Sequence, residues 1–321
     1  GKAPGWDGIL VEAYKNSIST NTELFRVVHL LWETEDIPSD LVKGIFIMIY
    51  KKKDRNDFNN YRAICLLCHA YKLLSAVVSQ RLSTEIEPLL PYSQAGFRPA
   101  RGSRDNVSIL KWTINMLLRE SREAVVTFID YTAAFDSESQ IFLDEALSHA
   151  NISIMLRWII QAIFRAACGC VVLRTSDGST KLSELFDILR GVLQGDIFSS
   201  VAFIIGLWRL FTLYDVDTSG VSVGKPPFKI AISGLEYADD AGLLDDNVTN
   251  ASARVTALSI GSKQDAAMVI SIPKTKTMHI HKKTRVSATT ETEIADLKLT
   301  HICENCNRGY RRKRGPSIQT G

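Results

Sequence analysis

Two apolar segments of this chain run directly into aspartates. Residues 124–129 read Ala-Val-Val-Thr-Phe-Ile, a pattern typical of a buried strand, and Asp130 follows at once. A second apolar segment, residues 235–244, contains Tyr-Ala-Asp-Asp at positions 237–240. A buried carboxylate costs several kcal/mol unless it is paired or binds a metal ion. These placements predict a fold that gathers the acids at one polar site.

The three carboxylates of Asp130, Asp239 and Asp240 would make an all-oxygen site. Neighbouring side chains of a strand point to opposite faces, but a turn lets two adjacent aspartates reach one cation. Mg²⁺ prefers such hard ligands when phosphates supply the rest, and two ions would activate a nucleophile and stabilise a leaving pyrophosphate. The competing interpretation is an exposed turn at Asp239 and Asp240 and a helix cap at Asp130.

The order of predicted elements indicates an α+β fold with helices on one face of a sheet. Helices are expected at residues 9–33, 71–86, 103–118, 133–150, 152–167, 197–213 and 250–265. Strands are expected at residues 44–50, 61–67, 124–129, 170–174, 182–189 and 268–272, with a hairpin formed by 228–234 and 235–244. A pair of acids at Asp245 and Asp246 is expected in a solvated loop.

The composition is that of a globular protein, with 45% hydrophobic and 23% charged residues among 321. The net charge of +3 hides a split, because residues 1–280 carry 29 basic and 31 acidic side chains. A role with nucleic acid must therefore come from local basic patches. Three such patches are residues 43–62, the trio Arg98, Arg101 and Arg104, and residues 311–314.

Neither a membrane nor an oxidising compartment is expected from the sequence. The uncharged run at residues 197–208 stops at Arg209, too short to cross a bilayer. Six cysteines in a chain of this length do not form a disulfide framework, which favours a reducing, intracellular location.

Three motifs carry a family resemblance. Residues 128–136 (Phe-Ile-Asp-Tyr-Thr-Ala-Ala-Phe-Asp), 190–199 (Arg-Gly-Val-Leu-Gln-Gly-Asp-Ile-Phe-Ser) and 237–240 resemble, in order and separation, the catalytic motifs of reverse transcriptases. The Ala-Phe-Asp ending of the first is similar to the non-LTR (LINE-type) retrotransposon branch. Further blocks at residues 2–8 and 94–98 also resemble that family, so the resemblance covers roughly residues 1–280.

The resemblance implies a right-hand polymerase fold with fingers and palm, in which helices back an antiparallel palm sheet. It places the fingers mainly in residues 1–122, the palm in 123–280 and a basic tail in 281–321. The thumb is largely missing. Because the chain begins at Gly1 rather than Met, it is expected to be a piece of a longer polyprotein that also carries endonuclease and thumb regions.

The catalytic roles that follow from the resemblance fall on four residues. Asp130, Asp239 and Asp240 would ligate two Mg²⁺ ions, with Mn²⁺ as a substitute. Lys274, in a block at residues 269–276 that resembles the last palm motif, is a candidate general acid for pyrophosphate departure.

Nucleotide binding is assigned by the same resemblance. Phe135 matches the aromatic steric gate that selects deoxynucleotides, although its sequence context alone favours a plain core residue. Gln194 would contact the nucleotide, and Gly195 would allow close backbone approach, with a strand-to-helix turn as the competing interpretation. Lys52, or else Lys51, together with Arg62 would grip the triphosphate.

The cysteines fall in two groups. Cys65 and Cys68 satisfy a haem-attachment spacing, but their run is apolar and predicts two buried free thiols. Cys303 and Cys306 resemble the first half of a Cys2His2 zinc finger. Gln319 stands where the first histidine would lie, so a truncated finger is expected.

The resemblance therefore implies an RNA-directed DNA polymerase domain. Its substrates would be an RNA template, a DNA primer with a 3′-hydroxyl, and dNTPs, and target-primed synthesis would require nuclear access. Two alternatives stay open. One is a truncated or decayed copy that binds nucleic acid without catalysis, and the other is a different palm-type polymerase.

Overall fold

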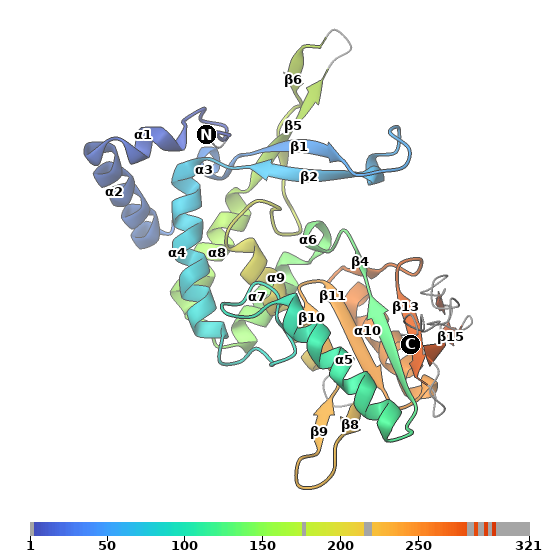
Figure 1. Cartoon of the computed structure of the whole chain (residues 1–321). Helices are drawn as coiled ribbons and strands as arrows, with labels where there is room; N and C mark the ends of the chain where they lie inside the picture. Colours follow the sequence, from blue (N-terminus) through green and yellow to red (C-terminus); the bar gives the residue numbers. More distant parts are fainter. Residues whose placement is uncertain are drawn as a thin grey trace, which may run out of the picture.

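The computed structural model describes residues 3–174, 178–214, 220–280, 286–287, 292–294 and 297–299 (Figure 1). The expected zinc-finger half at Cys303 and Cys306 lies outside these residues. The helices are α1 Val11–Lys15, α2 Ile18–Thr34, α3 Ser39–Val42, α4 His69–Ile86, α5 Ser103–Arg119, α6 Ala134–Ser137, α7 Gln140–His149, α8 Ile154–Ala166, α9 Ser199–Leu213 and α10 Val248–Gln264, with a 3-10 turn at Phe58–Asn60.

The strands are mostly short. They are β1 Gly44–Tyr50, β2 Tyr61–Leu66, β3 Ala124–Ile129, β4 Tyr131–Thr132, β5 Cys168–Arg174, β6 Thr180–Leu182, β7 Phe186–Asp187, β8 Val221–Val223, β9 Ile230–Ile232, β10 Gly234–Tyr237, β11 Asp240–Asp245, β12 Val269–Ile270, β13 Lys276–Ile280, β14 Val286–Ser287, β15 Thr292–Ile294 and β16 Leu297–Leu299.

One antiparallel sheet has the strand order β10-β11-β3-β13-β14. Its centre is β3, in which Ile129 lies opposite Ala241 of β11 and Phe128 lies opposite Lys276 of β13. The hairpin expected at residues 228–234 and 235–244 is wrong. The second of these segments folds back on itself as β10 and β11, whereas β9 pairs with β8. The turn at 238–239 breaks the apolar run, so the two aspartates fall between strands.

Helices cover both faces of this sheet, not one face as expected. Successive residues of β11 show why, because Leu243 and Leu244 are both fully buried yet point to opposite sides. Leu243 packs with Leu258 of α10 in the larger hydrophobic cluster, whereas Leu244 packs with Leu117 of α5 in a smaller one. Figure 1 shows α5 in front of the sheet and α10 behind it.

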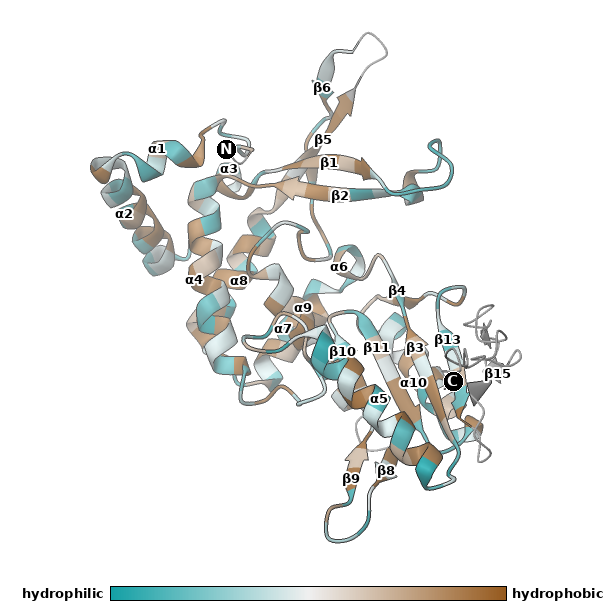
Figure 2. Cartoon of the chain, viewed as in Figure 1, coloured by the Kyte–Doolittle hydropathy of each residue, from teal (hydrophilic) through white to brown (hydrophobic). Residues whose placement is uncertain are grey.

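A second sheet has the order β2-β1-β5-β6, with β7 also paired to β5. The β1 and β2 strands form a long antiparallel hairpin, and β5 pairs with β1 in parallel. Figure 1 shows the β1–β2 and β5–β6 hairpins extending away from the helices, and Figure 2 shows that the loop joining β1 to β2 is hydrophilic. Segments 100 residues and more apart in sequence therefore meet in this sheet.

The larger core forms where α4, α7, α8 and α9 pack together. Cys65 and Cys68 contribute to it as buried free thiols, as predicted. Burial raises the pKa of the Cys65 thiol to about 12, which keeps it protonated and unreactive at neutral pH. In the described part of the chain, no helix combines the length and the apolar character needed to cross a membrane.

The helix expected at residues 9–33 is divided into α1 and α2. The break falls at Ser17, whose Oγ accepts a hydrogen bond from the backbone N–H of Thr20 at 3.2 Å and so caps α2. The periodic apolar pattern across the break does not reveal this change of direction.

The sequence predicted that Asp245 lies in a solvated loop, and this prediction is wrong. Asp245 is fully buried at the end of β11, and its carboxylate lies 2.9 Å from the guanidinium of Arg254 on α10. Arg254 itself is 7% exposed, so removing either partner would leave an unpaired buried charge. Asp246 is exposed as expected and binds Arg122 at 2.9 Å.

Candidate active site

The three aspartates meet at one edge of the antiparallel sheet. Asp130 follows directly after β3, and the turn between β10 and β11 carries Asp239. Because Ala241 of β11 lies opposite Ile129, the register places Asp240 beside the end of β3. The structure therefore brings together the three acids that the sequence singled out.

The Tyr-Ala-Asp-Asp turn depends on an unfavourable backbone conformation. Ala238 has φ of +55°, the left-handed region that residues with a Cβ atom rarely adopt. The side chain of Gln94 holds the turn in place, because its Oε1 accepts hydrogen bonds from the N–H groups of Ala238 at 3.1 Å and Gly96 at 2.8 Å. Gln94 is 2% exposed, so water does not compete for these bonds.

Gly96 packs directly against the same turn. A Cβ atom at this position would overlap the backbone nitrogen of Ala238, so glycine is needed for the close approach. The two segments also exchange backbone bonds, from Ala95 N–H to Glu236 O at 2.8 Å and from Glu236 N–H to Ser93 O at 3.0 Å. The block at 94–98 therefore supports the Tyr-Ala-Asp-Asp turn, a role that its sequence did not reveal.

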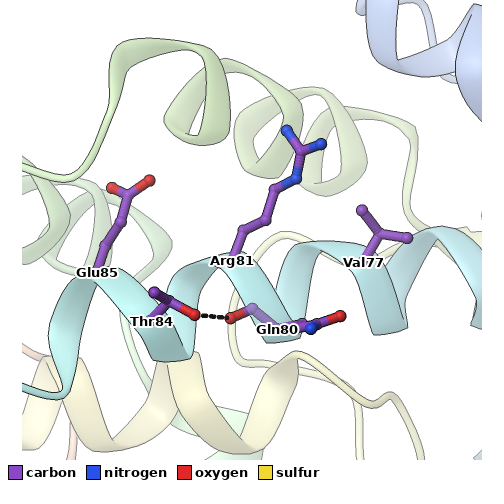
Figure 3. A pocket seen from close by; sticks show the side chains of 5 residues that line it. All are labelled: Val77, Gln80, Arg81, Thr84 and Glu85. Atoms are coloured by element: carbon purple, nitrogen blue, oxygen red, sulfur yellow. Dashed lines mark hydrogen bonds between the residues drawn. The ribbon is translucent and has the colours of Figure 1, made fainter.

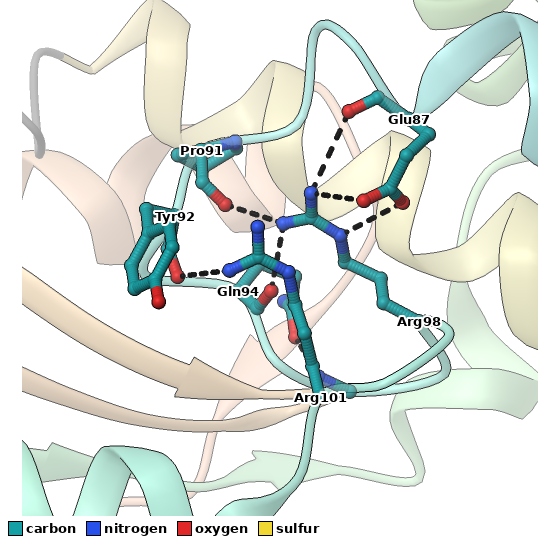
Figure 4. Close-up of polar contacts among 7 residues, drawn as sticks. Glu87, Pro91, Tyr92, Gln94, Arg98 and Arg101 are labelled. Atoms are coloured by element: carbon teal, nitrogen blue, oxygen red, sulfur yellow. Dashed lines mark hydrogen bonds and ion pairs between the residues drawn. The ribbon is translucent and has the colours of Figure 1, made fainter.

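Arg98 fixes this block rather than offering a free positive charge. Its guanidinium binds the Glu87 carboxylate at 2.7 and 3.0 Å and donates to the carbonyls of Pro91 and Gln94 (Figure 4). With 7% exposure it is buried, which removes it from the basic patch expected with Arg101 and Arg104. Pairing with Arg98 lowers the pKa of the Glu87 carboxyl.

A Gln94→Leu substitution is expected to loosen the Tyr-Ala-Asp-Asp turn. Leucine would leave the N–H groups of Ala238 and Gly96 buried and unpaired, lowering the free energy of unfolding by about 1–2 kcal/mol. Misplaced carboxylates would lower nucleotide incorporation by about 10-fold. Denaturant unfolding and primer extension measure both effects. Gln80→Leu, on the exposed face of α4, is the matched control, and equal effects from the two substitutions would contradict the role of Gln94.

The electrostatics of the site reflect its crowded acids. Lys274 Nζ lies 2.7 Å from Asp130 Oδ1, and the backbone N–H of Ser271 donates to the Asp130 carbonyl at 2.7 Å. Burial raises the pKa of the Asp239 carboxyl, and the neighbouring charges of Asp240 and Asp130 raise it further. Burial and the Asp130 charge likewise raise the pKa of Asp240, while Lys274 opposes both shifts.

This donor set suits a hard divalent cation. Within the described residues, no three Asp, Glu, His or Cys side chains are already close enough to enclose a metal ion. Mutual repulsion between the aspartates and the ion pair of Asp130 with Lys274 give a physical reason for that spacing. Three carboxylates on adjacent strand ends are nevertheless the ligands that such a cation would satisfy, and it would offset the burial that raises the pKa values of Asp239 and Asp240.

Phe135, five residues after Asp130, contacts two other aromatic rings. Its ring is parallel to that of the fully buried Phe203, with centroids 4.3 Å apart, and Phe97 meets it edge-on at 6.0 Å. Phe135 itself is half-buried, so one part of it supports the core and another part remains accessible. The structure thus accommodates both interpretations of this residue.

Gln194 and Gly195 lie against β2. The Gln194 carbonyl accepts from Cys65 N–H at 2.8 Å, and the Gln194 Nε2 lies 3.3 Å from the Asp136 carboxylate. Gly195 has φ of +121°, and a Cβ atom there would overlap the carbonyl oxygen of Cys65. This glycine serves close packing between two protein segments, whereas the Gln194 amide faces the Asp136 side chain.

The basic residues of the β1–β2 hairpin are exposed. Lys51 and Lys52 directly follow β1, and Arg62 on β2 lies opposite Ile49. The charge of Lys51 is near enough to oppose the burial that raises the pKa of Asp136. Lys51 is therefore electrostatically coupled to Asp136, whereas Lys52 and Arg62 share the hairpin with it.

Two hollows border the site. One, of about 290 Å³, lies between α5 and the sheet and reaches Tyr237 and Asp240. The other, of about 250 Å³, lies between the β1–β2 hairpin and the segment at residues 190–193, and its lining includes Met48, Ala63, Asp136 and Arg190. A third hollow on α4, beside Arg81, is lined by neither the aspartates nor the Phe135 stack (Figure 3).

The fold and its three aspartates define a polymerase of the right-hand class. Solved structures support this fold, at sequence identities that establish the fold alone. Apo telomerase from Candida tropicalis, truncated from its C-terminal domain, matches with a TM-score of 0.55 and 14% sequence identity. The match covers 83% of the present chain and 55% of the telomerase chain. Telomerase from Candida albicans in complex with a fragment of telomeric RNA matches with a TM-score of 0.52 and 12% sequence identity. This match covers 90% of the present chain and 50% of the telomerase chain.

The chain belongs to the reverse transcriptase (RNA-dependent DNA polymerase) family, whose model matches residues 50–295. It is 28% identical over 249 residues to the Pol polyprotein of the type-2 retrotransposable element R2DM of Drosophila melanogaster, covering 74% of this chain and 21% of the relative. It is 22% identical over 250 residues to the 149 kDa protein of transposon TX1 of Xenopus laevis. That match covers 78% of this chain and 19% of the relative.

These relatives confirm the resemblance to non-LTR retrotransposon reverse transcriptases. The chain spans about a fifth of the length of both relatives. Members of the family depend on divalent metal ions and bind an RNA template and a primer.

Proposed function

We propose that this chain is an RNA-directed DNA polymerase domain that adds dNTPs to the 3′-hydroxyl of a DNA primer on an RNA template. The observation that supports this most is the placement of Asp130, Asp239 and Asp240 at adjoining strand ends. The endonuclease and thumb regions would belong to a longer polyprotein, and target-primed synthesis would require access to the nucleus.

Asp130, Asp239 and Asp240 would hold two Mg²⁺ ions, or Mn²⁺ in their place. When bound, these ions lower the barrier to in-line attack and offset the charge of the leaving pyrophosphate. Lys274, 62% exposed in its side chain and already beside Asp130, would give a proton to the pyrophosphate oxygen.

The nucleotide would be held by residues on two sides of the acids. Arg62 and Lys52, with Lys51 as the second candidate, would bind the triphosphate from the flexible side chains of the β1–β2 hairpin. Gln194 would contact the nucleotide, Gly195 would let its segment approach closely, and Phe135 would exclude a 2′-hydroxyl.

The division into fingers at residues 1–122, palm at 123–280 and tail at 281–321 is also part of this proposal. The sheet that contains β10, β11, β3 and β13 would be the palm. The strand β5 lies in the proposed palm range yet pairs with β1, so the chain would return to the fingers between two palm segments.

Primer extension on an annealed RNA template and DNA primer, at low salt with and without Mg²⁺, tests the proposal. Metal-dependent incorporation of dNTPs is the expected result. A folded protein that incorporates no nucleotide would contradict catalysis by this chain.

The second candidate is a truncated or decayed copy that binds nucleic acid without catalysis. The observation that favours it is Glu138, whose carboxylate is 1% exposed and has no hydrogen-bond partner among the described residues. A buried carboxyl without a hydrogen-bond partner, in the same segment as Phe135 and Asp136, costs stability, as expected of a sequence that has begun to decay. Salt-dependent RNA binding without incorporation would support this candidate.

A Phe135→Ala substitution is expected to relax sugar selection. Removing the ring would open space for a 2′-hydroxyl and raise the ratio of rNTP to dNTP incorporation by about 10-fold or more. The ratio is measured in one protein preparation, so a general loss of folded protein does not alter it. An unchanged ratio together with lower stability would show that Phe135 is a core residue only.

A further inference from the structure

The β8–β9 hairpin projects from the palm sheet away from the aspartates. Val221 lies opposite Ile232 and Val223 opposite Ile230, and residues 224–229 form the tip. Val221 and Val223 are fully buried in the smaller hydrophobic cluster together with Leu117 and Ala124. Ala124 begins β3 and Asp130 follows its end, so the hairpin base lies about 20 Å from the acids. Figure 1 shows this hairpin at the lower end of the molecule.

The β8 side of the hairpin, up to the start of the tip, is held firmly. The backbone N–H of Gly224 donates to Glu120 Oε1 at 2.9 Å, and the guanidinium of Arg122 donates to the Ser222 carbonyl. Gly224 has φ of +91°, and a Cβ atom there would lie 2.6 Å from the Phe228 carbonyl oxygen. Two adjacent prolines at positions 226 and 227 further restrict the backbone of the tip.

The tip exposes an aromatic ring between two positive charges. Phe228 is 81% exposed, and both Lys225 and Lys229 are exposed. Residues 220–235 contain no aspartate or glutamate, so neither lysine has a neutralising partner within the hairpin sequence. Arg119 is exposed in the last turn of α5, and its neighbour Glu120 binds Gly224 at the start of the tip.

We propose that this tip is a second nucleic-acid contact, in which Phe228 stacks on an unpaired base while Lys225 and Lys229 lie at the flanking phosphates. A single ring with a basic border suits one base, since every base has a flat face for stacking. A protein interface would require about 800 Å² from each partner, far more than Phe228 and its exposed neighbour Ile230 supply.

Binding of unpaired oligonucleotides to the full chain tests this proposal. Fluorescence anisotropy would compare single strands of RNA and DNA with a fully paired duplex, across a series of salt concentrations. The variants are Phe228→Ala, Phe228→Trp and the double substitution Lys225→Ala with Lys229→Ala. Phe25→Ala, an exposed phenylalanine on α2, and Lys15→Ala with Lys263→Ala are the matched controls.

Phe228→Ala is expected to weaken single-strand binding by about 5-fold or more, and Phe228→Trp to retain it. The double lysine variant should reduce the slope of log affinity against log salt by about 1.4. A 5-iodouridine placed in the bound strand should crosslink to Phe228. If Phe228→Ala lowers the affinity for RNA and DNA equally, the tip can bind either strand. If it lowers the affinity for RNA alone, the tip binds the template.

Unchanged affinity of Phe228→Ala for single strands, or an equal loss for the paired duplex, would overturn the proposal. The measurement needs no nucleotide incorporation. An Asp239→Ala protein is expected to bind single strands as the parent does, so failure of catalysis and failure of this contact give different results.

Discussion

An Asp239→Ala protein is expected to lose nucleotide incorporation by about 10³-fold or more while keeping its fold. The carboxylate lies in the turn between β10 and β11, next to Asp240 and Asp130, where the proposed metal ions would bind. Removing it also removes repulsion among three acids, so the melting temperature should stay equal or rise. Primer extension and thermal unfolding on the same preparation measure both effects.

The matched control is Asp36→Ala, which removes an exposed carboxylate after α2. It should leave incorporation within two-fold of the parent, while Asp239→Asn should be nearly as inactive as the alanine variant because it too lacks the charge. Incorporation by Asp239→Ala at a rate close to the parent would show that the chemistry does not depend on this turn.

Replacing Glu138 with methionine is expected to raise the free energy of unfolding by about 2–4 kcal/mol at neutral pH. The Glu138 carboxylate lies against Gly206 of α9 and has no hydrogen-bond partner in the described part of the chain. Methionine fills a similar volume without a buried polar group. Denaturant unfolding at pH 7.5 measures the gain, and a loss of stability would contradict it.

The pH dependence of stability provides an independent reading of Glu138. Burial raises its pKa well above the ordinary value, so the folded state holds the proton more tightly than the unfolded state. Its favourable contribution is fully present below the unfolded pKa of about 4.3 and is lost as pH rises through the folded pKa. The parent should therefore lose stability relative to Glu138→Gln as pH rises above 4.3.

Glu145→Gln, on the exposed face of α7, is the control for this comparison. This control measures the effect of a Glu→Gln change at a solvent-exposed position. Parallel stability curves for the parent and Glu138→Gln would show that Glu138 is ionised or paired in solution.

The acids and their neighbourhood could be predicted because their signals are local. Asp130 directly follows an apolar strand, and Asp239 and Asp240 interrupt an apolar hairpin. In both places a charge stands within a few residues of a segment that the fold must bury. The pairing of the strands could not be predicted as well from the sequence. The segment at 228–234 looked like the partner of 235–244, but the turn at Ala238 made 234–237 and 240–245 partners and left β9 to pair with β8.

Contacts between distant segments escaped the sequence for a related reason. Gln94 and Ala238 are 144 residues apart, and the pattern around Gln94 suggested only a block near the template. Asp245 looked like a solvated acid because Asp246 follows it, whereas the fold pairs it with Arg254 inside the protein. Neither partner is visible until the helices and strands are placed together.

The sequence by itself determined the family, most helices and which acids the fold brings together, because periodicity and short motifs are properties of neighbouring residues. Only the tertiary structure decided what holds the Tyr-Ala-Asp-Asp turn, that helices cover both faces of the sheet, and that Glu138 is buried without a hydrogen-bond partner among the described residues. Those features depend on which surfaces exclude water together, and that is settled when segments far apart in the chain pack against one another.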